Sequence, residues 1–278
     1  MIFIFKILIR LGWMKYFNMR YRSSYNNYPI TIPVINGLGK ENLTLSEQWM
    51  TAVITHLLKV KKGAFIDVGV NVGQTLLKLR SVDSNLKYIG FEPNPACVYY
   101  VQELIKANAF SNTTLVPAGI SDEDHLLILN FYSDGALDSS ASIVKDFRPQ
   151  KIYRKEYVAC FQYESFHELL ENESISIVKI DVEGAELQVL NSLANMLEQK
   201  RPFVLVEILP AYRIENSDRI TRQAEIQKLI KKLNYRILRI QKSTFGFTKI
   251  DRIDINPPIE DCDYLLCPDE DISLIGPA

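Results

Sequence analysis

Two segments place turn-forming and acidic residues directly after apolar runs. The run AFIDVG contains Asp67 and continues into the turn GVNVG (69–73), and the run KYIGFE ends in Glu92. Glycines directly after a strand let the backbone turn tightly and approach a ligand closely. Glu92 lies 23 residues after Gly69, close to the spacing at which an acid hydrogen-bonds a ribose hydroxyl. Together the segments predict a nucleoside site, although a plain strand-to-helix turn and an exposed strand-end charge would be a simpler interpretation.

A third segment, VKIDVEGAE (178–186), gathers three carboxylates and a lysine where a strand should give way to a helix. Asp181 could cap that helix, and Glu183 and Glu186 could complement its dipole. These structural roles explain less well why Lys179 stands so close to two acids. Because open α/β sheets bind ligands outside the carboxyl ends of their strands, the segment is a candidate for the reacting groups.

Short apolar runs alternate with helical stretches from residue 63 onward. Most runs are rich in β-branched or aromatic residues and apolar on both faces, which is typical of covered parallel strands. The expected strands are residues 64–69, 87–92, 113–119, 176–182 and 202–208, and the expected helices are 73–80, 95–109 and 185–199. This alternation predicts an α/β, Rossmann-like doubly wound sheet with helices on both faces.

Several stretches lie outside this alternation. HLLILNFYSD and EYVACFQYE predict an inserted antiparallel pair, and a helix at 221–233 leads to a second expected pair, YRILRI (235–240) and DYLLCP (263–268). Ser121 and Asp122, after the third run, could hydrogen-bond an adenine edge or serve only as turn residues. Upstream, Ser46 is the expected cap of an amphipathic helix.

The segments IDVGVNVGQTLL, GFEPNP and VKIDVEGAELQVL resemble, in order, the motifs of the FkbM-type family of S-adenosylmethionine-dependent methyltransferases. The resemblance extends from about residue 45 to residue 208. It implies a class I methyltransferase sheet of seven strands with the last antiparallel, S-adenosylmethionine as the cofactor, and O-methylation as the usual reaction. An inserted antiparallel pair and an N-terminal helical segment complete the expected architecture.

The resemblance also implies roles for the matching residues. Glu92 would bind the ribose with Asn94 beside it, and Asp122 falls where an adenine contact is expected. Asp181 would face the site of methyl transfer, and Val70 stands where the family often has alanine. The residues that would line the methionine part of the cofactor are Asp67, Gly69, Asn71 and Gly73.

Methyl transfer requires an acceptor oxygen held in line with the methyl group at about 3 Å, and a hydroxyl acceptor gains from a base. Asp181 is the first candidate for that base, Glu183 is the second, and Lys179 is expected to orient one of them. No metal is required, although the clustered acids leave a magnesium-assisted variant open. We therefore expect an O-methyltransferase acting on a hydroxyl of a sugar, glycolipid or secondary metabolite.

Two other functions remain open at this point. A nicotinamide-dependent oxidoreductase or epimerase could use the same turn and Glu92, but the G-x-N-x-G spacing lacks the G-x-G-x-x-G form, and no Tyr-x-x-x-Lys pair stands in a plausible place. A non-catalytic module could keep the nucleoside site without turnover. The intact acidic segment at 181–186 argues against that second alternative.

The first 22 residues, MIFIFKILIRLGWMKYFNMRYR, raise the question of a membrane contact. Lys6 and Arg10 interrupt an apolar run that is too short to span a bilayer, and no signal-peptide pattern is present. An amphipathic helix here could contact anionic lipid or a partner, but we favour a helix packed on its own domain or on a second subunit of a homo-oligomer. The expected division is a helical and connector segment, 1–44, with a polar connector at 21–28, before a methyltransferase domain, 45–278.

Composition narrows the remaining classes of function. The 278 residues are 47% apolar and carry 32 basic and 33 acidic side chains, so the chain can bury a core and has no overall field that would attract nucleic acid. Four cysteines without a C-x-x-C pair fit neither a disulfide framework nor, with three histidines, a zinc site. The expected location is the cytoplasm, either free or at the inner face of a membrane.

Overall fold

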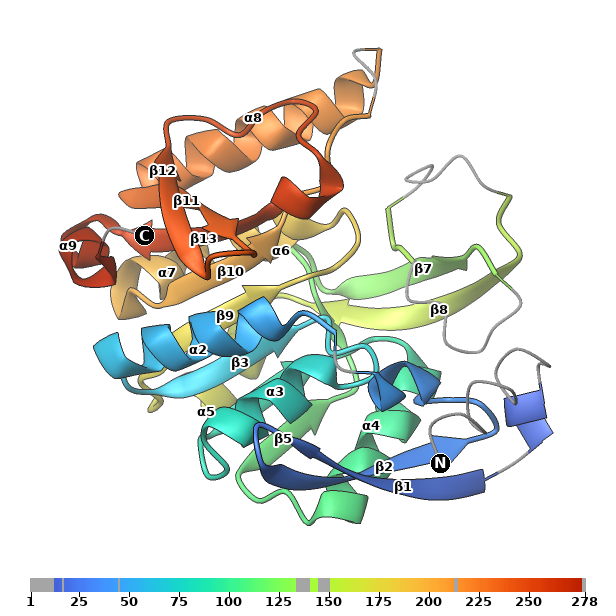
Figure 1. The fold of residues 1–278 in the computed structure, drawn as a ribbon. Helices are drawn as coiled ribbons and strands as arrows, with labels where there is room; N and C mark the ends of the chain where they lie inside the picture. The colour runs from blue at the N-terminus through green and yellow to red at the C-terminus, as the bar shows by residue number, and fades with distance from the viewer. Residues whose placement is uncertain are drawn as a thin grey trace.

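The computed structural model describes residues 13–16, 18–44, 46–133, 141–144, 151–212 and 215–276. Its centre is an eight-stranded sheet in the order β12-β11-β13-β10-β9-β3-β4-β5 (Figure 1). The strands of this sheet are β3 (Ala64–Val68), β4 (Tyr88–Phe91), β5 (Thr113–Val116), β9 (Ile175–Ile180), β10 (Phe203–Glu207), β11 (Tyr235–Gln241), β12 (Gly246–Ile250) and β13 (Asp263–Pro268).

The pairing of these strands follows the predicted class I arrangement. Strands β5, β4, β3, β9 and β10 are parallel neighbours, and β13 enters antiparallel between β10 and β11. The five predicted parallel strands and the antiparallel pair of β11 and β13 are therefore confirmed. The eighth strand, β12, was not predicted, because GFTKI is short and half polar and lies antiparallel to β11 at the open edge of the sheet.

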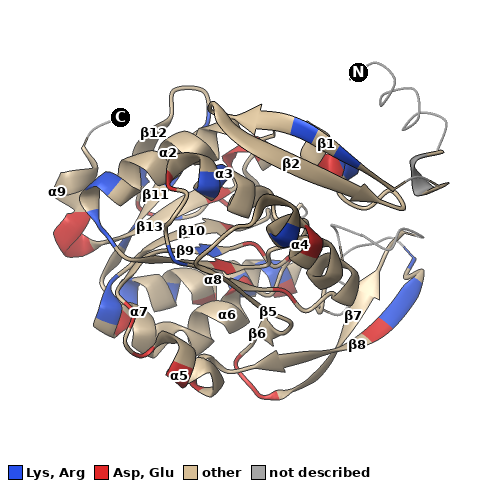
Figure 2. Cartoon of the chain, turned by 90° about the horizontal axis from the view of Figure 1, so that it is seen from below, with Lys and Arg blue, Asp and Glu red and all other residues tan. Residues whose placement is uncertain are grey.

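Helices cover both faces of the sheet, as predicted. One buried core joins the sheet to α2, α3 and α4, and a second joins its other face to α5, α6, α7 and α8 (Figure 2). The helices are α2 (Gln48–Val60), α3 (Gln74–Val82), α4 (Pro95–Asn108), α5 (His167–Leu170), α6 (Glu186–Ser192), α7 (Ala194–Lys200), α8 (Ser217–Lys232) and α9 (Ile272–Ile275). Short 3-10 turns are η1 (Trp13–Tyr16), η2 (Lys40–Leu43), η3 (Tyr163–Phe166), η4 (Ile259–Asp261) and η5 (Asp269–Asp271).

The helices depart most from the predictions at three places, and their other ends differ by at most two residues. The helix expected at 185–199 is two helices that meet at Leu193, and α8 begins four residues early, capped by Asn216, whose side chain accepts from the Arg219 N–H. The Ser46 cap was wrong, because the residue before α2 is Glu47 in a left-handed conformation, with no side-chain cap.

The N-terminal region contains a β-hairpin instead of a connector. Strands β1 (Asn18–Tyr25) and β2 (Tyr28–Ile35) pair antiparallel, so the prediction of helix and connector was wrong for residues 18–35, and residues 1–12 lie outside the described part. The physical reason is the period-2 pattern of β2, which buries Ile30, Ile32 and Val34 in the core shared with α3 and α4. The Asn108 side chain bonds both the N–H and the carbonyl of Thr31, which ties the hairpin to α4.

A separate three-stranded sheet lies beyond the carboxyl edge of the main sheet (Figure 1). Its strands are β6 (Gly119–Ile120), β7 (His125–Phe131) and β8 (Arg154–Phe161), in the order β6-β8-β7. The antiparallel pairing of β7 and β8 confirms the predicted insertion.

Among the helices that the structure describes, none is long and apolar enough to cross a bilayer.

Candidate active site

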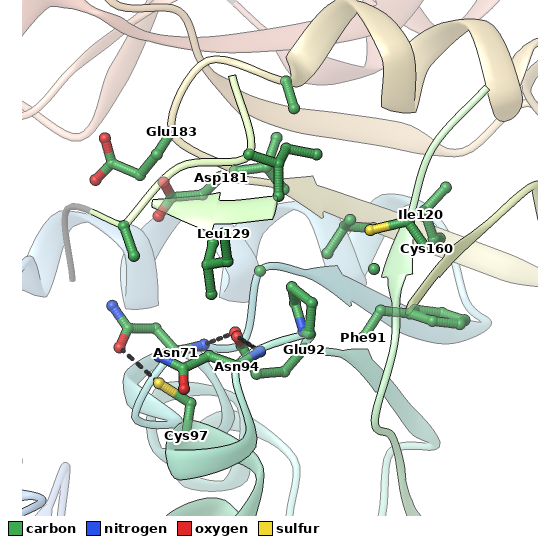
Figure 3. A pocket seen from close by; sticks show the side chains of 18 of the residues that line it. Asn71, Phe91, Glu92, Asn94, Cys97, Ile120, Leu129, Cys160, Asp181 and Glu183 are labelled. Carbon is green, nitrogen blue, oxygen red and sulfur yellow. Dashed lines mark hydrogen bonds between the residues drawn. The ribbon is translucent and has the colours of Figure 1, made fainter. Parts of the chain in front are cut away.

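A cavity opens at the carboxyl edge of the main sheet, where the strand order reverses between β3 and β9. This is the position at which open α/β sheets bind ligands. Its polar lining residues are Asn71, Glu92, Asn94, Asp181, Glu183 and Glu207. Its apolar lining includes Phe91, Ile120 and Leu129 (Figure 3). Ala141 and Ile143 also contribute to it. The cavity thus offers carboxylates on some walls and apolar surface on others.

Glu92 is a buried carboxylate held by the backbone of two neighbouring turns. Its Oε2 accepts from the Asn71 N–H at 2.7 Å and its Oε1 from the Asn94 N–H at 2.8 Å (Figure 3). Burial raises the pKa of Glu92 to about 7, although these two backbone donors act in the opposite direction. Because a carboxylate can accept about four hydrogen bonds, both oxygens keep acceptor capacity for hydroxyl groups in the cavity.

The turn after β3 brings two loops into contact. Gly69 has a φ of +88°, and a Cβ atom at this position would lie 1.9 Å from the carbonyl oxygen of Asp181. A residue with a side chain would therefore push the loop after β3 away from the loop after β9. Asn71, with a φ of +50°, then points its N–H at Glu92, and Gly73 is the N-cap residue before α3.

Lys179 contacts two predicted site residues, one that lines the cavity and one that is buried behind it. Its ammonium lies 3.1 Å from Oδ2 of Asp181, which faces the cavity, and 3.5 Å from Oδ1 of Asp67, which is completely buried. Asp67 also accepts from the Tyr88 hydroxyl at 2.7 Å, and its burial raises its pKa. Burial opposes the charge of Lys179, but Asp181 and Asp67 outweigh it and raise the pKa of the lysine. Lys179 is therefore a fixed cation that orients Asp181.

A short segment closes the cavity on the side of β7. Ser142 exchanges backbone hydrogen bonds with Asn130, and its hydroxyl donates to the carbonyl of Glu183 at 2.6 Å. Glu183 itself adopts a φ of +52° in the loop between β9 and α6. Ala141 and Ile143 flank Ser142 and contribute apolar surface to the cavity wall.

The structure brings half of the predicted site residues to the cavity. Those that line it are Gly69, Asn71, Glu92, Asn94, Asp181 and Glu183. Asp67, Val70 and Lys179 are buried beside it, and Gly73 lies at the start of α3. Ser121 is buried and bonds its exposed neighbour Asp122 at 3.3 Å, whereas Ile120, one residue earlier, lines the cavity.

Glu207 is the acidic lining residue that the sequence reasoning missed. It is the last residue of β10 and lines the cavity together with Asp181. The available signal was its place at the carboxyl end of a predicted parallel strand, the same place that Glu92 has after β4. Within the described residues, no group of three or more His, Cys, Asp or Glu side chains is arranged to hold a metal ion.

The pattern of the Methyltransferase FkbM domain matches residues 67–237, more than half of the chain, and the match includes each of these strand ends. The chain belongs to the FkbM methyltransferase family. This confirms the resemblance in the motifs and makes the chain a methyltransferase of the S-adenosylmethionine-dependent kind. No curated protein matches the chain.

Solved structures with a similar chain path are distant in sequence. A methyltransferase FkbM from Methylobacillus flagellatus KT is 14% identical with a TM-score of 0.46, and the alignment covers 74% of this chain but only 43% of that one. A putative caffeoyl-CoA O-methyltransferase from Staphylococcus aureus is 11% identical with a TM-score of 0.49, over 95% and 98% of the two chains. Aeropyrum pernix fibrillarin with bound S-adenosyl-L-methionine is 12% identical with a TM-score of 0.41, over 89% and 81%. The family assignment rests on the domain match.

The cavity of this FkbM domain has the chemistry that S-adenosylmethionine requires. Glu92 offers an anchored carboxylate for vicinal hydroxyls, and Phe91, Ile120 and Leu129 offer apolar surface for a base. The remaining lining carboxylates suit a ligand with a cationic sulfonium and ammonium.

Proposed function

We propose that this FkbM methyltransferase is an O-methyltransferase that acts on a hydroxyl of a sugar, glycolipid or secondary metabolite, with S-adenosylmethionine bound in the cavity between β3 and β9. The observation that carries the proposal is the arrangement of Glu92, fixed by the N–H groups of Asn71 and Asn94, in one cavity with Asp181 and Glu207. In this proposal one carboxylate would bind the ribose, and the others would attract positive charge or take a proton.

The binding roles follow from the contacts. Glu92 would hold the ribose, and Asn71 and Asn94 fix its orientation through their N–H groups. Asp181, which is paired with Lys179 at 3.1 Å, would attract the cationic part of the cofactor. Asp67 does not line the cavity, but its Oδ1 lies 3.5 Å from the ammonium of the same lysine and so helps to hold Lys179 in place.

The bound cofactor would supply an electrophilic methyl group. The protein must then hold the acceptor oxygen in line with that group and remove its proton. Besides Glu92, the carboxylates that line the cavity are Asp181, Glu183 and Glu207, and one of these would take the proton. Ala141 and Ile143, fixed through Ser142, would limit the access of water to this end of the cavity.

Methyl transfer from radiolabelled S-adenosylmethionine tests the proposal. The purified protein is incubated with simple sugars, glycolipids and hydroxylated small molecules, and the labelled product is treated with mild base. A methyl ether keeps its label under these conditions, which is the expected result. Labelled methanol released from the product would indicate a carboxylate acceptor and contradict the proposal. The Glu92→Ala variant serves as the control for labelling that does not depend on the cavity.

A further inference from the structure

Glu207 is the last residue of β10 and belongs to a row of acidic residues that runs across neighbouring strands. Val206 of β10 pairs with Ile180 of β9, and Glu207 pairs with Asp263 of β13. Residues at the same level of neighbouring strands point to the same face of a sheet. Asp181, Glu207 and Asp263 therefore lie side by side at the carboxyl edge, and Glu207 is the member between the other two. Like Asp181, it lines the cavity.

The three carboxylates differ in their partners. Asp181 has Lys179 at 3.1 Å, and Asp263 has Lys242 at 2.6 Å. Among the described residues, the side chain of Glu207 makes neither an ion pair nor a hydrogen bond. A lysine partner lowers the proton affinity of a carboxylate, whereas a buried carboxylate without a cation or donor holds a proton firmly. Burial raises the pKa of Asp263 as well, but Lys242 opposes that rise. Glu207 is thus the best proton acceptor of the row.

The other charged groups around Glu207 strengthen this difference. Half-buried Glu207 has a pKa raised to about 9, first by burial and then by the charges of Asp181, Asp263, Glu183 and Glu186. Glu47, from the start of α2, lines a small recess with Glu207 and is paired with Lys78. The cations of the surrounding elements, Lys78, Lys179 and Lys242, are each bound to another carboxylate.

This inference rests on the proposed function. We propose that Glu207, not Asp181, takes the proton of the acceptor hydroxyl, and that the arrival of the positively charged cofactor frees Glu207 for this role. In the empty cavity Glu207 carries a proton, and a cation beside it favours its ionised form. In the reaction the bond from oxygen to methyl forms, the bond from sulfur to methyl breaks with its electron pair left on sulfur, and the hydroxyl proton moves to Glu207. Asp181 stays paired with Lys179 and acts as a positioning residue.

A measurable consequence distinguishes the two forms of the cofactor. S-adenosylmethionine carries one more positive charge than S-adenosylhomocysteine, and the two share the ribose and the base. Binding of S-adenosylmethionine should therefore release a proton from Glu207, and binding of S-adenosylhomocysteine should not. Glu92 and Glu186, with pKa values raised to about 7, are mostly ionised at pH 8 and contribute little to the difference.

Calorimetric titration at pH 8 in phosphate and in Tris, which differ in their heats of ionisation, counts the released protons. The wild-type protein should release up to about one proton more with S-adenosylmethionine than with S-adenosylhomocysteine. Glu207→Gln should remove this difference, and the exposed control Glu198→Gln should keep it. If both ligands bind and release the same number of protons, or if the extra proton is still released by Glu207→Gln, the inference is overturned and the proposed function is not. If neither ligand binds, the proposed function is overturned as well.

A second variant tests the inference with Glu207 intact. Asp263→Asn removes a neighbouring negative charge and leaves Lys242 free, and both changes lower the proton affinity of Glu207. The pH at which proton release is greatest should therefore fall. An unchanged pH profile in a folded Asp263→Asn protein would contradict the assignment of the proton to Glu207.

Discussion

At the scale of single residues, Glu92 is the side chain on which the proposed cofactor site depends most. Two turns that follow adjacent strands each give one N–H to its carboxylate, so its position is fixed before any ligand arrives. The sequence singled out this residue because an acid at the end of a second strand, 23 residues after Gly69, is close to the spacing expected for a ribose contact. It did not predict Glu207, because no glycine turn or second acid follows it in the sequence ILPAY.

Glu92→Ala should weaken the binding of S-adenosylhomocysteine about 100-fold, because two charge-assisted hydrogen bonds to the ribose are lost. Calorimetric titration of the variant measures the effect, with Glu198→Gln as the control on the protein surface. An unchanged dissociation constant in a folded Glu92→Ala protein would remove the ribose role from this residue.

Buried carboxyls should also make the stability of the protein depend on pH. Glu92 and Glu186 have pKa values raised to about 7 by burial, so the folded state holds protons that the unfolded state has already lost above about pH 4.5. Stability should therefore fall as the pH rises from 5 to 8, by about 1 kcal/mol or more. Urea unfolding across this range measures the slope. Glu186→Gln keeps the acceptor for the Gly184 N–H and should flatten the curve, whereas a steeper curve would contradict the argument.

At the scale of elements, the site depends on loops that are locked to one another. The loop after β3 approaches the loop after β9 at Gly69, and Ser142 binds the latter through the carbonyl of Glu183. The parallel strands could be predicted because burial on both faces leaves an apolar run with few alternatives. The hairpin of β1 and β2 could not, because its polar and tyrosine-rich sequence resembles a connector until the core that buries Ile32 is known.

Gly69→Ala should destabilise the protein by about 3 kcal/mol or more. The new methyl group would lie 1.9 Å from the backbone carbonyl oxygen of Asp181, which cannot move aside as a flexible side chain could. Gly276→Ala is the control, since Gly276 also has a positive φ but has no atom within 4 Å of the added group. Urea midpoints of the two variants should differ clearly. Equal midpoints would show that the loops separate without cost.

At the scale of the whole molecule, the N-terminal hairpin belongs to the same core as the sheet. Ile30, Ile32 and Val34 are buried with residues of α3 and α4, so residues 18–35 are part of the fold that holds the cavity. A division at residue 45 therefore describes the motifs but not the packing. The sequence motifs locate the chemistry, and the packing of distant segments was visible only in three dimensions.

Ile32→Ala should lower the free energy of unfolding by about 2–5 kcal/mol, the range for a large side chain removed from a core. Unfolding followed by tryptophan fluorescence and by circular dichroism should still show one coincident transition. Separate transitions would mean that the hairpin is an independent unit.

The most direct test of the central claim is calorimetric titration of the wild-type protein with S-adenosylhomocysteine and, in parallel, with NAD. The two ligands share adenosine, and the account predicts micromolar binding of S-adenosylhomocysteine and no binding of NAD. Binding of NAD alone would contradict the assignment of the cavity and direct attention to redox chemistry. Binding of neither would contradict a working cofactor site in this chain.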